Sequence, residues 1–253
     1  MAKPVVIILI PAFNEEAKIA NALHILKPIV RHELGGFTPV VTVINDGSTD
    51  RTEIIAKNAG AGVIKLQQNM GKAYAVMYGI NHYAKTKPAA IMLVDADLWG
   101  IEGQILRKTI ERSTHKVVPT MVQARSHEDN QPQDNYQTGG SGFRCFNSAA
   151  IEKLGALNLH HFERTRKDGA PGFGLEEFFI NYMKLLPKHR LLTLPLKDGY
   201  FKVSAPWRNS QANYRMQNEE IPRAIAKMKK LLAQKRSAAR KVRNRRNIFS
   251  QAK

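Results

Sequence analysis

Short apolar runs rich in β-branched residues recur through the first hundred positions of the chain. The runs VVIILI, VVTVIN, GVIKL and IMLVD begin at residues 5, 40, 62 and 91. Each is short and mostly apolar on both faces, which is typical of strands buried inside a parallel sheet. The stretches between them, residues 15–30, 50–58 and 72–83, have helical spacing of apolar positions. Strands alternating with helices predict an α/β fold in which helices cover both faces of a parallel sheet.

Polar clusters follow directly after each of these four runs. In chain order they are PAFNEE, NDGSTD, QQNMGKAYAV and DADLWG. Right-handed crossovers bring the carboxyl ends of parallel strands to one edge of a sheet, where ligands of such folds bind. We therefore expect the four clusters to converge on a single site.

Each cluster has a functional and an ordinary interpretation. Asp95 and Asp97 are suited to Mg²⁺ or Mn²⁺ with a substrate's phosphates, or to a solvated turn. In NDGSTD, Asp46 at the strand end is placed to meet a base, whereas a plain turn would use Ser48 or Thr49 to cap the next helix. Gly71 and Lys72 open a helix, and a helix N-terminus favours anions such as phosphate.

The second half of the sequence is less regular. Residues 126–142 are rich in turn formers and predict a long surface loop. FRCF predicts a short strand, and Asn147 or Ser148 is expected to cap the helix that follows. Another helix is expected to start near Leu175.

The positive charge is concentrated at the C-terminal end. The net charge is +18, and residues 221–253 contain 12 Lys or Arg and no acid, which leaves +6 for residues 1–220. Residues 221–246 have a rough apolar stripe beside the cationic face, which favours an anionic membrane surface. The alternatives are a final helix packed on the core and, less favoured, contact with nucleic acid. The single cysteine, Cys145, excludes an intramolecular disulfide and favours a cytoplasmic protein. Together with the basic segment, this predicts a location in the cytoplasm, peripheral at the inner face of the membrane.

The four clusters together resemble the nucleotide-sugar-binding half of glycosyltransferase family 2, which has the GT-A fold. The resemblance is close over residues 4–100 and looser to about residue 185. It implies one GT-A domain over residues 1–215, with a nucleotide-binding half (1–100) and an acceptor half (101–215), followed by a basic helix and tail (216–253). It also implies nucleotide-binding roles for seven residues: Pro11, Ala12, Glu15, Asp46, Gly71, Lys72 and Asp95. Asp95 and Asp97 would form the metal pair, with Asp97 the direct ligand of Mg²⁺ or Mn²⁺.

Two later segments resemble those of dolichyl-phosphate mannose synthases and glucosyl-3-phosphoglycerate synthases. GGSGFRCF implies sugar or acceptor contacts at Gly140, Ser141, Gly142 and Arg144. GFGLEE implies that Glu176 contacts the sugar and that Glu176 or Glu177 is the general base. The alternative is that both acids simply suit the start of a helix. A late histidine that completes the metal site in such relatives has no counterpart here, which leaves the third ligand and the stereochemistry open.

The sequence therefore predicts an enzyme, a hexosyltransferase that moves one sugar from a nucleoside diphosphate donor with metal assistance. A UDP-sugar is the favoured donor and GDP-mannose the next. The acceptor is unknown, with a lipid phosphate or a small phosphorylated molecule as candidates. A sugar nucleotidyltransferase and a non-catalytic protein that binds nucleic acid or other anions through its tail are the alternatives.

Overall fold

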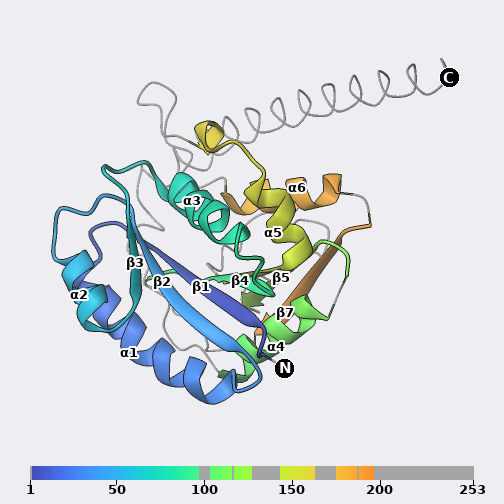
Figure 1. The fold of residues 1–253 in the computed structure, drawn as a ribbon, viewed down its shortest axis with the longest axis horizontal. Helices are drawn as coiled ribbons and strands as arrows, with labels where there is room; N and C mark the ends of the chain where they lie inside the picture. Colours follow the sequence, from blue (N-terminus) through green and yellow to red (C-terminus); the bar gives the residue numbers. More distant parts are fainter. Residues whose placement is uncertain are drawn as a thin grey trace.

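A seven-stranded sheet with helices on both faces forms the body of the protein in the computed structural model (Figure 1). The structure describes residues 2–96, 103–115, 117–126, 143–162, 175–186 and 188–196. The strands are β1 (Val5–Ala12), β2 (Thr38–Asn45), β3 (Gly62–Lys65), β4 (Ala90–Leu93), β5 (Thr120–Ser126), β6 (Arg144–Asn147) and β7 (Arg190–Leu196). The helices are α1 (Glu16–Glu33), α2 (Thr52–Asn58), α3 (Lys72–Ala84), α4 (Gly103–Thr114), α5 (Ser148–Gly155), the 3₁₀ turn η1 (Leu159–Phe162) and α6 (Leu175–Leu185).

The strand order β3-β2-β1-β4-β6-β5-β7 makes the sheet mostly parallel. β1, β2, β3 and β4 run in one direction, and β5 and β7 share it. Only β6 is reversed among the described strands, and it pairs antiparallel with both β4 and β5. The four strands predicted from the apolar runs are all present, and so is the α/β class.

Alternate residues of β1 face two separate apolar cores. Ile7 and Leu9 pack into the core under α3, α5 and α6, whereas Val6, Ile8 and Ile10 pack into the core under α1 and α4. Figure 1 shows α3, α5 and α6 on one side of the sheet and α1, α2 and α4 on the other. Because both faces of β1 are buried, its sequence is a continuous apolar run with no alternation of polar residues.

The predicted helix starts are partly confirmed. Asn147 caps α5 by accepting a hydrogen bond from the backbone N–H of Ala150 at 3.0 Å, and α6 begins at Leu175 as expected. The prediction that Ser48 or Thr49 caps α2 is wrong, because both residues bond instead to Asn14. The N-cap of α2 is Arg51, which makes no side-chain capping bond, and Asp50 just before it accepts the N–H of Thr52 on Oδ1 at 2.9 Å.

None of the helices in the described part of the chain combines the length and the apolar character that a membrane crossing requires. The basic segment 216–253 lies outside the described residues, so its membrane role stays a prediction.

Candidate active site

The first two polar clusters are joined by side-chain hydrogen bonds at the carboxyl edge of the sheet. The backbone N–H of Asn14 donates to Ser48 Oγ at 3.0 Å, and its side-chain Oδ1 accepts from the N–H of Thr49 at 2.9 Å. The N–H of Glu15 donates to Thr52 Oγ1 at 2.8 Å. Asn14 adopts a φ of 53°, a left-handed conformation that asparagine tolerates better than most residues. The loops after β1 and β2 therefore form one platform.

Asp50 stabilises this platform by accepting hydrogen bonds from both α1 and α2. Its Oδ2 accepts the N–H of Glu16 at 3.1 Å, which ties α1 to the start of α2. Burial alone would raise the pKa of Asp50, but hydrogen bonds from the hydroxyl and N–H of Thr52 and from the N–H of Glu16 outweigh it. The net effect is a pKa below the ordinary aspartate value.

Asp46 links the second cluster to the third. Its side chain is only 3% exposed, and its two oxygens accept the N–H groups of Met70 and Gly71, each at 2.8 Å. Its own N–H donates to the carbonyl of Ala12 at 2.9 Å. The contact that the structure shows is thus with the loop before α3, and the predicted contact with a base stays a prediction.

Gly47 allows the second and third clusters to approach closely. It has a φ of +70°, and a Cβ at this position would overlap the backbone of Gln68 and Asn69. Gly71 has a φ of +91° and is followed at once by the first residue of α3, Lys72. Both glycines therefore stand where a left-handed backbone is required.

Lys72 links the third cluster to the fourth. Its Nζ lies 2.8 Å from Oδ1 of Asp95, and the two side chains are 36% and 21% exposed. A continuous path thus runs from Ala12 through Asp46 and the loop before α3 to Lys72 and Asp95. The expected convergence of the four clusters is confirmed as far as the described residues reach.

The other predicted residues of this half lie on the same edge. Pro11 and Ala12 end β1 and pair with Ile44 and Asn45 of β2. The carboxylate of Glu15 forms an ion pair with Lys18 at 3.2 Å. Asp97 lies outside the described residues, so its predicted metal role is not tested.

The reversed direction of β6 brings the second half of the chain to this edge. Arg144 begins β6 and pairs with Leu93, two residues before Asp95. It is 4% exposed, so a direct sugar contact by Arg144 would need an opening in its surroundings. The segment with Gly140, Ser141 and Gly142 lies outside the described residues. The chain nevertheless enters β6 beside Asp95.

Glu176 and Glu177 lie in the first turn of α6, and nothing is described of their side chains. β7 begins at the amino edge, shortly after α6 ends. The first turn of α6 is therefore at the end of the helix away from the start of β7, which is consistent with the predicted sugar and base roles.

Sequence reasoning missed two kinds of residue in the quoted clusters. One is the set that holds the loops together: Asn14, Asp50 and Thr52, with Ser48 and Thr49, which the sequence had suggested only as helix caps. The other is Phe13, a large aromatic side chain that is 42% exposed directly after Ala12. The sequence did carry a signal for Phe13, because it is a single aromatic residue between a buried strand and a polar turn.

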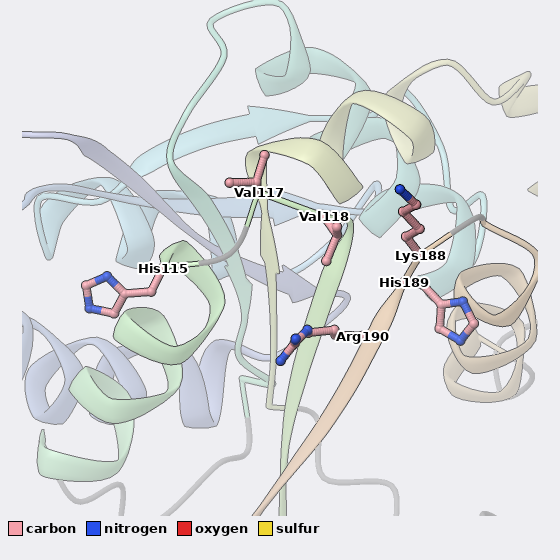
Figure 2. A pocket seen from close by; sticks show the side chains of 6 residues that line it. All are labelled: His115, Val117, Val118, Lys188, His189 and Arg190. Carbon is pink, nitrogen blue, oxygen red and sulfur yellow. The ribbon is translucent and has the colours of Figure 1, made fainter.

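A cavity of about 500 Å³ lies on the opposite edge of the sheet. Its lining residues precede β5 and β7 or begin β7: His115, Val117, Val118, Lys188, His189 and Arg190. Figure 2 shows His115 on one side of Val118 and Lys188 and His189 on the other, with the His189 ring turned away from it. This amino-edge cavity is separate from the four clusters, and its cationic side chains do not gather around one point.

Comparison with known proteins identifies the family. Residues 7–166, more than half of the chain, match the family described as "Glycosyl transferase family 2". The chain therefore belongs to glycosyl transferase family 2, and the predicted enzyme class is confirmed. This also decides against a sugar nucleotidyltransferase.

Curated relatives match a short part of the chain. The 4,4'-diaponeurosporenoate glycosyltransferase of Staphylococcus aureus (strain MRSA252) is 37% identical over 97 residues, which is 36% of this chain and 23% of that enzyme. The homologue from strain NCTC 8325 / PS 47 gives the same identity and coverage. The aligned segment thus spans less than a quarter of these relatives.

Solved structures of glucosyl-3-phosphoglycerate synthase from Mycobacterium tuberculosis share the fold. Its complex with Mn²⁺, UDP-glucose and phosphoglyceric acid has a TM-score of 0.59 at 19% identity, covering 89% of this chain and 80% of that one. Its complex with Mn²⁺, UDP and glucosyl-3-phosphoglycerate has a TM-score of 0.52 at 19% identity, covering 76% and 71%. The GT-A fold predicted from the sequence is confirmed by this likeness.

Proposed function

We propose that this protein transfers a single sugar from a nucleoside diphosphate sugar, with a UDP-sugar as donor, to an acceptor that carries a phosphate. The observation that carries the proposal is the continuous path from Ala12 through Asp46 to Lys72 and Asp95 at the carboxyl edge. The structural neighbours with Mn²⁺, UDP and UDP-glucose support the choice of donor.

The edge offers complementary groups to the parts of such a donor. The exposed ring of Phe13 is a surface on which a base can stack. Lys72, at the N-terminus of α3, supplies a positive charge for the diphosphate. Together they orient the donor with its sugar toward the start of β6.

The described residues suit a divalent metal, Mg²⁺ or Mn²⁺. Asp95 presents a partly exposed carboxylate at the end of β4, and this carboxylate already holds a cation, the Lys72 ammonium. Carboxylate oxygens are the ligands these metals prefer. No group of three or more potential ligands occurs among the described residues, so Asp97 would have to contribute. A bound metal would neutralise charge on the departing diphosphate.

A thermal-shift panel tests the donor. UDP, GDP, CDP and dTDP are compared with and without Mn²⁺ on wild type and on Asp97→Ala. We expect a rise in melting temperature with UDP and Mn²⁺ that the variant loses, because ligand bound only to the folded state stabilises it by mass action. A folded wild type that responds to no nucleotide would overturn the proposal.

Paired variants in α6 test the general base. Glu176→Gln is expected to lower turnover by about 100- to 10,000-fold while UDP affinity stays unchanged, because a general base acts only on the acceptor hydroxyl. Glu177→Gln is the matched control, with the same change one position along. Loss of turnover in Glu177→Gln alone would move the role to Glu177.

The acceptor is tested by offering 3-phosphoglycerate and a polyprenyl phosphate with a labelled donor. Phosphoglyceric acid is bound by a structural neighbour, and a lipid phosphate would suit the basic C-terminal segment. Transfer to only one of them would identify the acceptor class. If the donor binds but its sugar is transferred to neither compound, the proposal that the acceptor carries a phosphate is wrong.

A further inference from the structure

Lys72 and Asp95 are each needed elsewhere in the proposed reaction, yet in this structure they hold each other. Their charged atoms are 2.8 Å apart. While the pair is intact, the Lys72 ammonium is occupied when a diphosphate approaches, and the Asp95 charge is neutralised when a metal approaches. The ion pair therefore opposes each ligand separately.

The surroundings allow this pair to exchange partners. Both side chains are partly exposed, at 36% and 21%, and a partly exposed ion pair contributes little to stability. The Lys72 ammonium is carried on a flexible four-carbon stem. The backbone just before it is fixed, because Asp46 accepts the N–H groups of Met70 and Gly71. Only the lysine side chain needs to move.

We propose that Lys72 and Asp95 act as an exchange pair that couples metal binding to nucleotide binding. Without ligands the two residues neutralise each other. When the donor is bound, Lys72 contacts the diphosphate and Asp95 faces the metal. Each ligand thus removes the competitor of the other, and the two bind cooperatively. This inference rests on the proposed function, since it concerns the same site.

The exchange predicts a gain in affinity in each of two variants, for a different ligand in each. Lys72→Met leaves Asp95 with its full charge, so Mn²⁺ alone should bind more tightly, by about 5-fold or more, the lower end of typical couplings. Asp95→Asn removes the carboxylate that pairs with Lys72 at 2.8 Å, and with it a negative charge near the phosphates. UDP without metal should then bind more tightly than to wild type, and Mn²⁺ should improve it less.

Lys65→Met is the matched control. It breaks another ion pair at the end of a strand, Lys65 with Glu53 at 2.7 Å, in which the lysine is 55% exposed. That pair lies outside the path between the four clusters. Both Mn²⁺ affinity and UDP affinity should stay at the wild-type values.

The experiment combines two titrations on each folded variant. Free Mn²⁺ is followed by electron paramagnetic resonance, and UDP binding by calorimetry with and without Mn²⁺. Linkage requires that Mn²⁺ improves UDP binding by the same factor as UDP improves Mn²⁺ binding. We expect this factor to be smaller in both site variants than in wild type and in Lys65→Met.

The outcomes separate the two proposals. If wild type binds UDP with Mn²⁺ but Lys72→Met shows no rise in Mn²⁺ affinity, the exchange is wrong and the proposed function stands. The exchange would also be wrong if Asp95→Asn bound UDP more weakly than wild type in the absence of metal. If wild type binds no UDP under either condition, the proposed function fails and the exchange fails with it.

Discussion

At the residue scale, Asp46 shows how a buried carboxylate can hold a neighbouring loop in place. Both oxygens accept backbone N–H groups, from Met70 and from Gly71. Asp46→Asn replaces one acceptor with an NH₂ group, so one N–H would face another donor. We expect a loss of about 1–3 kcal/mol in the free energy of unfolding, measured by urea denaturation.

Glu53→Gln is the comparison for Asp46→Asn, because the contacts of Glu53 within the described residues are ion pairs with the exposed Lys57 and Lys65. Its effect should be much smaller. An equal loss in the two variants would show that the two N–H bonds of Asp46 contribute little.

Asp50 gives a prediction about pH. Hydrogen bonds from Thr52 and Glu16 outweigh burial and lower its pKa in the folded protein. The stabilisation is therefore complete above the unfolded pKa of about 3.9 and is lost as the pH falls through the lower folded value. The difference in unfolding free energy between wild type and Asp50→Asn should be larger at pH 6 than at pH 3. A difference that does not change with pH would contradict this.

At the element scale, Gly47 decides how closely the loops after β2 and β3 pack. Gly47→Ala introduces a left-handed alanine, at a cost of about 1–2 kcal/mol, and its methyl group would overlap the backbone of Gln68 and Asn69. We expect a lower melting temperature together with weaker UDP binding, measured by calorimetry. Gly35→Ala is the control, since no atom lies within 4 Å of its added Cβ. Equal effects of the two changes would contradict the packing role.

The elements that were easiest to predict from the sequence are those whose buried positions are apolar. β1, β4 and α3 were predictable for this reason, and β2 was predicted although it also buries Thr42 and Asn45. α4 was not, because its buried side includes Thr109 and Ser113. Their hydroxyls donate to carbonyls of their own helix, of Ile105 at 2.7 Å and of Ile110 at 2.8 Å, so they are satisfied without water. Such residues lower the apolar content of the helix, so its buried face is harder to recognise in the sequence.

The pairing of strands that are far apart in the chain could also not be predicted from the sequence. β5 and β7 are parallel neighbours although α5 and α6 lie between them in the chain. The reversal of β6, which places Arg144 beside Leu93, depends on that arrangement. The four clusters could be placed on one edge by topology alone, whereas the Lys72–Asp95 pair and the Asp46 contacts depend on side-chain geometry.

At the scale of the whole molecule, the two edges of the sheet are electrically independent. β1 has eight residues, and at about 3.3 Å each the edges are about 26 Å apart. This exceeds the screening length of about 8 Å at physiological salt. Lys188→Gln combined with Arg190→Gln, in the amino-edge cavity, should leave UDP affinity unchanged in calorimetry. Lys72→Met should weaken it with Mn²⁺ present, and the reverse pattern would place the donor at the cavity.

The loops after β1 and β2 are tied through amide hydrogens that bond to side chains of the opposite loop, at Asn14, Glu15 and Thr49. These bonds slow the exchange of the three amides with deuterium, so we expect measurable protection before any ligand is added. A donor would then meet a surface that is already shaped. Its association should proceed in one step, with an observed rate that rises linearly with nucleotide concentration and does not level off at the speed of a loop closure.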